Sequence, residues 1–490
     1  MIDDIANWLV RASPANAESL RIQPTALAVR CYFVLTLLFL LSSCAVGPKY
    51  KRPTVSVPDT YRGPGSDAGQ PATGSLGDEK WWTVFQDEQL QQLIRHALSQ
   101  NYDVHIAAAR VLEAQAALGI TRADQLPTIT GNASGSSQRY AKTAITPTFE
   151  TSPAEANLAL FWELDFWGKF RKATAAARAT LLATTWAQHA VITSLISDVA
   201  TAYFQLLELD MELAISQRTL DARKESVRLV EIRQKGGTTS LLELRQSQEL
   251  MYTAAAAIPD LERRIEQQEN FINILLGQNP GPILRGQPLI ATTILPNVPA
   301  GLPSSLLERR PDVQSAEQQL VAANARIGIA KAAYFPQITL TAVGGYQSPA
   351  LTDLFTGPAG FWSFVGQLTQ PIFEGGRIRS GVKLTEAQQQ EAVFFYKKTI
   401  QAGFREVSDS LIAYRKNQDF REQQASLTSA ALDATRLANV RYQGGVTSYL
   451  EVLDTDTLSF TAELNLAQAE LNERLALVQL YNALGGGWQQ

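Results

Sequence analysis

Apolar positions recur at alternating spacings of three and four residues along two very long segments of the chain. Such spacing gathers the apolar side chains on one helix face and is typical of a coiled-coil seam, although a buried core helix shows it too. The pattern predicts helices at 169–235 and 377–443. At about 1.5 Å per residue, each would be a rod of roughly 100 Å, longer than a compact domain needs. The apolar positions are Ile192, Leu195, Val199, Ala202, Leu206, Leu209 and Leu213, then Ile400, Phe404, Val407, Leu411 and Tyr414.

Shorter helical patterns surround each of these long segments. Each long segment ends at a pair of glycines, Gly236 and Gly237 in one case and Gly444 and Gly445 in the other, which should let the chain turn back into a second helix. Pro259 interrupts the helix after the first pair and is expected to kink it. The predicted shorter helices are 102–123, 241–276, 311–333 and 449–484.

Apolar and more polar residues alternate between the shorter and the long helix of each half, which predicts two β-strands per half. Any half-buried sheet fits this pattern, but strands of about ten residues with aromatic side chains near their ends also fit a transmembrane barrel. Four strands cannot close such a barrel, since the smallest have about eight, so a membrane barrel would need several chains. The apolar positions are Ala156, Leu158, Leu160, Trp162, Leu164 and Phe166, then Ile338, Leu340 and Ala342, then Trp362, Phe364 and Leu368.

The two halves of the chain are copies of each other. DVHIAAARVLEAQAALGITRADQLPTIT begins at Asp103, and DVQSAEQQLVAANARIGIAKAAYFPQIT begins at Asp312. RQKGGTTSLLELRQ at 233–246 likewise matches RYQGGVTSYLEVLD at 441–454. We therefore predict a duplication of a long unit, with a first repeat at 81–277, a connector at 278–305 and a second repeat at 306–490.

The first 43 residues have the features of a signal region. YFVLTLLFLL at 32–41 is too short to span a bilayer, which takes about 20 residues, and fits the apolar part of a secretory signal. It runs into LSSC, which resembles a bacterial lipobox, so Cys44 is predicted to carry a covalent lipid; an ordinary signal peptide with an incidental cysteine is the alternative. The stretch before this signal, residues 1–28, is unusually long and contains the acidic residues Asp3, Asp4 and Glu18. This favours Val29 as the translation start. Residues 44–80 are predicted to form an extended, lipid-anchored tether.

The composition of the 490-residue chain favours neither nucleic-acid binding nor catalysis. Its formal net charge is -4 and charged residues make up 18%, so no nucleic-acid partner is expected. The 2 Cys and 3 His residues occur in no metal-binding spacing, and no phosphate-binding loop or nucleophile elbow is present. We expect no enzyme activity, no metal and no cofactor other than the covalent lipid.

The chain resembles the outer-membrane efflux family of TolC-like channels, and within it the lipoprotein branch of resistance-nodulation-division (RND) pumps. The resemblance rests on CAVGPKYKRP at 44–53, GLPSSLLERRPD at 301–312, ENFINILLGQNP at 269–280 and the terminal ALGGGW. It implies an α+β membrane protein in which a long α-helical coiled-coil barrel joins a transmembrane β-barrel. It also implies a homotrimer with four strands per chain, and a belt around the tunnel that contains the connector.

The resemblance places a gate at the periplasmic tip, just after the second glycine pair. Leu450 aligns with an apolar constriction of the tunnel, and Glu451 and Asp454 align with acidic rings, which favour cations. The residues by themselves leave another interpretation open, because acidic residues at a helix start are favoured by the helix dipole.

A latch for this gate is also implied by the resemblance. Tyr442 and Glu243 match a tyrosine and an acid whose hydrogen bond joins the two hairpins. Thr447 departs from the pattern, since some relatives have an arginine there that ties neighbouring protomers together, so the resemblance does not extend to that lock.

The implied function is a passive duct that carries drugs or other small molecules from the periplasm to the exterior. Its partners would be a periplasmic adaptor, an inner-membrane RND-type pump and outer-membrane lipid. A channel for type I secretion is the alternative within the family, and a structural periplasmic coiled-coil lipoprotein is the alternative outside it. Ala45, in place of an aspartate after the cysteine, favours the outer membrane, with the helical barrel in the periplasm.

Overall fold

The computed structural model describes residues 46–62, 74–291 and 303–489. The predicted signal region, the start at Val29 and the lipid anchor at Cys44 lie outside these residues. The described residues form two compact units that do not follow the two repeats. Each repeat contributes its strands to one unit and most of its helices to the other. The segments 127–172 and 331–373, which contain the strands, belong to the same unit.

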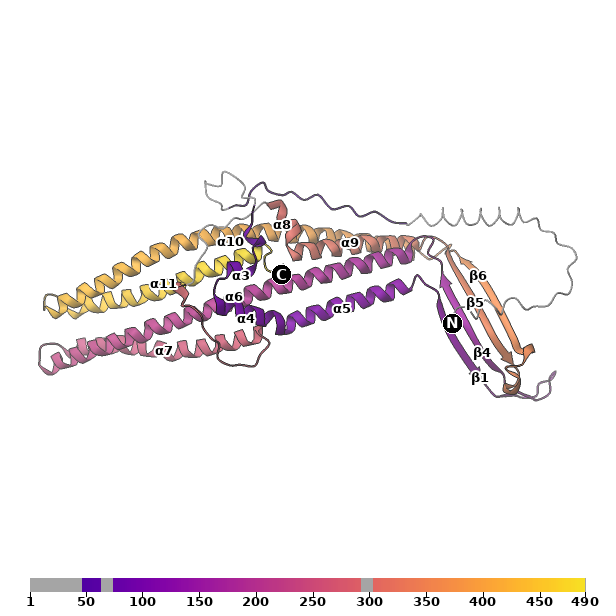
Figure 1. Cartoon of the computed structure of the whole chain (residues 1–490), viewed down its shortest axis with the longest axis horizontal. Helices are drawn as coiled ribbons and strands as arrows, with labels where there is room; N and C mark the ends of the chain where they lie inside the picture. The colour runs from indigo at the N-terminus through magenta and orange to yellow at the C-terminus, as the bar shows by residue number, and fades with distance from the viewer. Residues whose placement is uncertain (1–45, 63–73, 292–302, 490) are drawn as a thin grey trace. The chain divides into compact units, whose positions relative to one another are not determined.

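The helical unit contains the long helices that the apolar stripes predicted (Figure 1). Both long helices, α6 and α10, have the predicted bounds, and three of the four shorter ones end one residue earlier than expected. The longer helices are α5 (Tyr102–Ala123), α6 (Lys169–Lys235), α7 (Leu241–Leu275), α9 (Pro311–Ala332), α10 (Arg377–Gln443) and α11 (Tyr449–Ala483). The short ones are η1 (Leu76–Asp78), α3 (Trp81–Val84), α4 (Glu88–Gln100), η2 (Leu289–Ala291) and α8 (Pro303–Arg309).

Two antiparallel hairpins, α6–α7 and α10–α11, lie side by side in this unit (Figure 1). The predicted seam is buried: Val199, Leu206 and Val407 are among its fully covered side chains. Helix α7 continues through Pro259 without a break.

The duplication is visible in the contact that closes each repeat. The side-chain amide of Asn101, the N-cap of α5, donates a hydrogen bond to the carbonyl of Leu275 at the end of α7 (2.9 Å). Arg310 stands in the equivalent place before α9 and donates through Nη1 to the carbonyl of Ala483 at the end of α11 (3.0 Å). The second repeat therefore makes the same contact with a charged side chain, which also binds the carboxylates of Asp312 and Glu406.

The other unit is a four-stranded antiparallel sheet with the order β1–β4–β5–β6. Two of its strands come from each repeat, as the alternation predicted. A short hairpin, β2 paired with β3, was not predicted. The bounds are β1 (Thr128–Gly135), β2 (Gln138–Tyr140), β3 (Phe149–Thr151), β4 (Ala154–Glu163), β5 (Gln337–Ser348) and β6 (Gly360–Thr369); η3 (Leu351–Asp353) and η4 (Gly357–Ala359) lie between β5 and β6.

Strand β4 ends earlier than its alternating pattern predicted. The pattern continued to Phe166, but the strand ends at Glu163. Asp165 lies just beyond it, and its carboxylate accepts hydrogen bonds from the backbone N–H groups of Phe170 (3.2 Å) and Arg171 (2.9 Å). These groups belong to the first turn of α6, where N–H groups lack partners within the helix, so Asp165 caps the helix instead of extending the strand.

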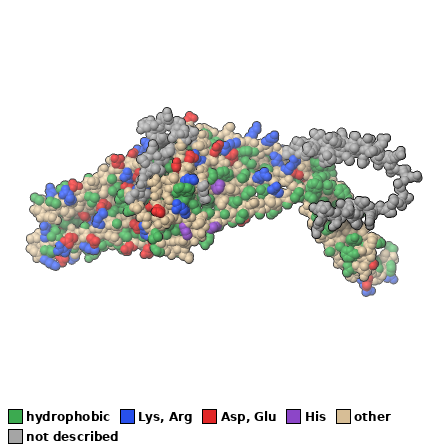
Figure 2. All heavy atoms as spheres, in the orientation of Figure 1, with side chains coloured by type: hydrophobic (Ala, Val, Ile, Leu, Met, Phe, Trp, Pro, Cys, Tyr) green, Lys and Arg blue, Asp and Glu red, His purple; other side chains and the backbone are tan. Residues whose placement is uncertain are grey.

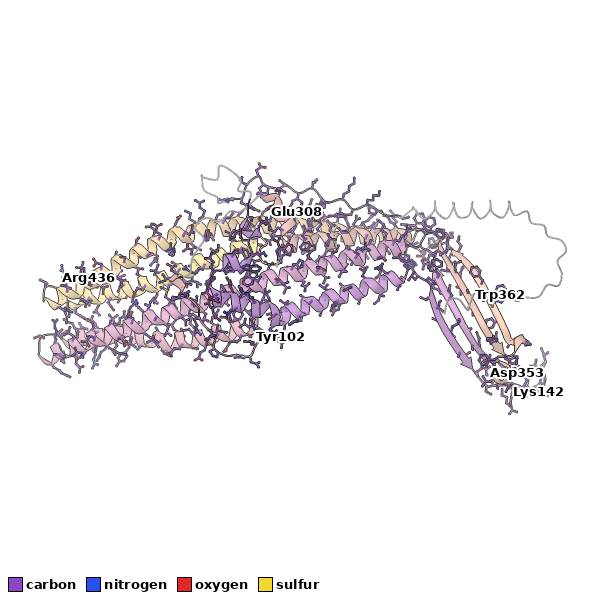
Figure 3. All side chains as sticks on the ribbon, viewed as in Figure 1. Tyr102, Lys142, Glu308, Asp353, Trp362 and Arg436 are labelled. Atoms are coloured by element: carbon purple, nitrogen blue, oxygen red, sulfur yellow. The ribbon has the colours of Figure 1, made fainter. Side chains whose placement is uncertain are left out.

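The two outer strands of the sheet are exposed on both faces. Every residue of β1 is exposed, and Trp362 on β6, labelled in Figure 3, is 82% exposed. Figure 2 shows hydrophobic and uncharged side chains over most of the sheet, whereas acidic and basic side chains alternate along the helices. An uncovered apolar face and two unpaired edges leave this sheet incomplete as a water-soluble structure.

The segment predicted to be a tether is extended in its described part, but it is bound to the helices. The hydroxyl of Tyr50 and the guanidinium of Arg52 both bind the carboxylate of Glu317 on α9, at 3.1 and 2.5 Å. Tyr61 is buried beside Phe404 of α10. The described part of this segment is therefore packed on the helical unit along its length, because its aromatic side chains bury apolar area against α9 and α10.

Candidate gate at the helical tip

Each long hairpin turns at its glycine pair. Gly237 and Gly445 adopt left-handed backbone angles, with φ of 71° and 72°, which favour glycine over residues with a Cβ atom. Gly236 and Gly444 precede them, and their backbone N–H groups donate to the carbonyls of Ile232 and Val440 in the last turns of α6 and α10, each at 3.0 Å. The two turns therefore share one geometry.

A small apolar cluster joins the two hairpins near these turns. It contains side chains from all four helices, with Tyr442 and Tyr449 as its largest members. Burial raises the pKa of Tyr449 to about 12, and the nearby carboxylate of Asp456 adds to the effect. The remaining buried members are Val227, Val230, Leu244, Ala438 and Val452.

The structure brings Tyr442 and Glu243 together across the two hairpins. The hydroxyl of Tyr442 points to Oε2 of Glu243 at 3.5 Å, which is a long hydrogen bond. The hydroxyl of Thr239 binds the same carboxylate oxygen. The guanidinium of Arg233 lies 4.7 Å from the centre of the Tyr442 ring, on which it stacks.

The three predicted gate residues have different surroundings. Glu451 is held within its own hairpin by the hydroxyl of Thr447 and by Arg441, whose Nε is 3.2 Å from Oε1. Leu450 is 65% exposed and Asp454 is exposed. The contact of Glu451 with Thr447 repeats that of Glu243 with Thr239, so Glu451 also has a local role at the start of α11.

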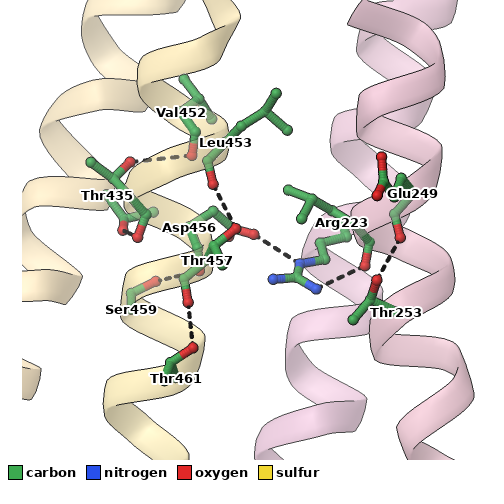
Figure 4. A network of polar contacts seen from close by, with 12 residues as sticks. Arg223, Glu249, Thr253, Thr435, Val452, Leu453, Asp456, Thr457, Ser459 and Thr461 are labelled. Atoms are coloured by element: carbon green, nitrogen blue, oxygen red, sulfur yellow. Dashed lines mark hydrogen bonds and ion pairs between the residues drawn. The ribbon is translucent and has the colours of Figure 1, made fainter.

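A stronger link between the hairpins was not predicted. Arg223 on α6 is 4% exposed, and its Nε lies 2.8 Å from Oδ2 of Asp456 on α11 (Figure 4). Its Nη1 donates to the carbonyl of Leu250 on α7 at 2.7 Å, and its guanidinium stacks on Phe460 at 4.9 Å. Arg218 on α6, whose side chain is largely exposed, also pairs with Glu463 on α11.

The apolar stripe contained a signal for this link. Continuing the three-and-four spacing beyond Leu213 leads to positions 216, 220, 223, 227 and 230. Arg223 is thus a charged residue on the face that should be buried, and a buried charge needs a partner. The identity of that partner could not be predicted, since Asp456 is 233 residues away in the chain.

Side-chain contacts hold the two hairpins together in this region. Polar links from one hairpin to the other lie beside a small apolar cluster, so they can be broken without dismantling a large core. Among the residues that the structure describes, no group of three or more His, Cys, Asp or Glu side chains is arranged to hold a metal ion.

Comparison with known proteins identifies one family. The family model described as "Outer membrane efflux protein" matches residues 93–278 and 302–486. The solvent efflux pump outer membrane protein SrpC of Pseudomonas putida is 38% identical over 463 residues, covering 92% of this chain and 97% of that protein. The probable outer membrane lipoprotein SilC of Salmonella typhimurium is 34% identical, with coverage of 93% and 98%.

Solved structures have the same fold. The open-state structure of the MtrE outer membrane channel of Neisseria gonorrhoeae superposes with a TM-score of 0.82 at 31% identity, covering 91% of this chain and 99% of that one. Sequence and fold therefore agree over almost the whole length of both proteins. The chain belongs to the outer membrane efflux protein family.

Proposed function

We propose that this protein is the outer-membrane channel of a tripartite efflux pump, a passive duct that carries small molecules from the periplasm to the exterior. The observation that carries this proposal is the four-stranded sheet with two unpaired edges and an uncovered apolar face. In lipid every backbone polar group needs a partner, so such a sheet is stable there only as part of a closed barrel. SrpC, a relative over nearly its whole length, is named as the outer membrane protein of an efflux pump.

The barrel is completed by further copies of the same chain, as a homotrimer. The free edge of β1 would pair with β6 of a neighbour, which supplies the missing hydrogen bonds on both sides. The exposed apolar residues of α5, among them Leu112 and Ile120, would pack on neighbouring helices in the same assembly. The long helices would then form a tunnel.

The tip of the helical unit forms the gate of this tunnel. Threefold symmetry would arrange Leu450, Glu451 and Asp454 as rings, and rings of carboxylates favour cations. A periplasmic adaptor and an inner-membrane RND-type pump would meet this tip and supply the energy. A lipid on Cys44 would anchor the chain in the outer membrane, as the name of SilC suggests for that relative.

Deleting the gene should make the parent bacterium more susceptible to several small toxic molecules, because the pump would lose its exit. Plasmid-borne wild-type protein should restore the original susceptibilities. The measurement is the minimal inhibitory concentration of a panel of organic solvents, dyes, antibiotics and metal salts. Unchanged susceptibilities, together with loss of a protein from the culture medium, would support type I secretion instead.

The double variant Tyr442→Phe, Glu243→Gln should raise single-channel conductance in planar bilayers. Loss of the hydroxyl and of the charged acceptor removes a link worth about 1 kcal/mol, so the gain should be a few-fold. Gln248→Ala is a suitable control, because Gln248 is half-buried on α7 and its side chain accepts a hydrogen bond from Arg245 of the same helix. A conductance equal to that of the wild type would show that this pair does not hold the tip closed.

A further inference from the structure

A carboxyl group is buried in the apolar core of the first hairpin, well away from the tip. Glu208 on α6 is 3% exposed, and its neighbours Leu206, Leu207 and Leu209 belong to the apolar cluster that packs the middle of the helical unit. The Oε1 atom of Glu208 is covered and has no hydrogen-bond partner. A carboxylate in such surroundings normally has a cation beside it, because an unpaired buried charge is very costly.

The cations closest to Glu208 are engaged by other carboxylates. The charged groups that act on it are Glu212 of its own helix and Arg264 of α7. Nη1 of Arg264 binds Oε2 of Glu212 at 3.3 Å, and the Arg264 side chain is 45% exposed. Arg285 of the connector binds Asp210, two residues further along α6, at 2.9 Å. Glu208 therefore has to be neutral to remain in this position.

Glu208 and Glu212 share a proton. They lie one turn apart on the same face of α6, and their side chains form a hydrogen bond. Two carboxyl groups can do so only when one of them is protonated. Burial, together with the charge and the hydrogen bond of Glu212, raises the pKa of Glu208 to about 8, although Arg264 opposes the shift. The proton is therefore held by Glu208.

The contact between α6 and α7 beside this pair is made by polar side chains. The side-chain amide of Gln268 on α7 donates to the carbonyl of Ala202 at 2.9 Å and to Oε1 of Gln205 at 3.1 Å, within two turns of Glu208 on α6. A negative charge on Glu208 would need water or a cation, and the covered Oε1 atom can reach neither while the helices are in contact. Loss of the proton therefore favours separation of α7 from α6 here.

The second repeat shows that the duplicated fold does not require this buried carboxyl. When the two glycine pairs are aligned, Glu208 corresponds to Lys416 and Glu212 to Phe420. The side chain of Lys416 is 73% exposed and pairs with Asp419 at 2.9 Å. The buried pair of glutamates is therefore a feature of the first hairpin alone.

We propose that the α6–α7 contact is a proton-dependent switch, which is closed while Glu208 is protonated and loosens when Glu208 loses its proton at alkaline pH. The carboxyl of Glu208 has its ordinary pKa of 4.5 when exposed and a pKa of about 8 when buried, so the closed state binds more protons between these values. The closed state is therefore most stable below this range and loses stability as the pH rises through it. The proposal goes beyond the export function and does not depend on it.

The test compares the wild type with Glu208→Gln, which has the shape of the protonated side chain and cannot ionise. Both are studied as the full-length protein, purified in detergent as the assembled oligomer, by hydrogen exchange of residues 261–275 of α7 with mass spectrometry. Comparing them at the same pH cancels the intrinsic pH dependence of exchange. At about pH 5 the two should exchange equally, and at about pH 9 the wild type should exchange at least tenfold faster.

Glu225→Gln is the matched control. Glu225 is an exposed glutamate on the same helix, paired with Arg228, and this variant should follow the wild type at both pH values. Thermal unfolding of the helices, followed by circular dichroism, is the second measurement: at about pH 9 Glu208→Gln should unfold at a higher temperature than the wild type. If Glu208→Gln exchanged as fast as the wild type at about pH 9, or faster, the switch would be ruled out. The same pH response in Glu208→Gln and Glu225→Gln would assign the response to other groups and would also overturn the proposal.

Discussion

Replacing Arg223 with glutamine should open the tip and raise single-channel conductance in planar bilayers about fivefold or more. Arg223 is buried and joins α6 and α7 of the first hairpin to α11 of the second through Asp456 and the carbonyl of Leu250. Breaking a fully buried ion pair costs about 3–5 kcal/mol. Asp456 keeps some contact with solvent, so a loss of about 1–3 kcal/mol is expected here. Each 1.4 kcal/mol or so shifts the closed-to-open ratio about tenfold.

Further variants distinguish the loss of this ion pair from a general loss of positive charge. Arg228→Gln, on the same helix, breaks an exposed pair with Glu225 and should leave conductance unchanged, because water screens the attraction between solvent-exposed charges. Asp456→Asn should reproduce the effect of Arg223→Gln. The double variant should add little to either change, since both remove the same interaction. Strict additivity, or an effect of Arg228→Gln as large as that of Arg223→Gln, would contradict a latch at this position.

Gly345→Val should abolish insertion of the protein into the outer membrane. Gly345 lies on β5 opposite Asn157 of β4 in the centre of the sheet. A Cβ atom at this position would collide with the carbonyl oxygen of Ala156 and come within 2.6 Å of the Cα of Asn157. Both are backbone atoms held by the strand pairing, so neither can move aside without separating β4 from β5. The measurement is the amount of protein recovered in outer-membrane fractions.

Gly344→Val tests whether the effect belongs to the position or to the residue type. The nearest atom to a Cβ at Gly344 is the carbonyl oxygen of Phe361, at 4.0 Å, an ordinary van der Waals distance. This variant should reach the outer membrane in near-normal amount. If both variants inserted equally well, β4 and β5 would have to be more loosely paired than the structure shows.

The two hairpins are held together by two kinds of contact with different consequences. The apolar cluster around Tyr442 and Tyr449 provides contact area, which does not depend strongly on orientation. The Arg223–Asp456 and Tyr442–Glu243 links are directional and are lost after a small displacement. We therefore expect the polar links to determine when the tip opens and the apolar cluster to limit how far.

The sequence by itself determined the helices, the strands and the duplication. A spacing of three and four residues is a local property, so α6 and α10 could be recognised from Ile192, Ile400 and their neighbours, and the glycine pairs marked where they end. Alternation placed β4, β5 and β6 on the same grounds. It failed at the end of β4, where Asp165 caps a helix through contacts that alternation does not describe.

Only the tertiary structure decided which distant side chains meet. Arg223 could be recognised as a charge on a buried face, but its pairing with Asp456 depends on how two hairpins from different repeats lie against each other. Arg310 likewise meets the carbonyl of Ala483, 173 residues away in the chain, because the end of α11 packs against the start of α9. Local periodicity follows from the geometry of one helix or strand, whereas such contacts follow from the packing of several, and that packing is set by the whole chain.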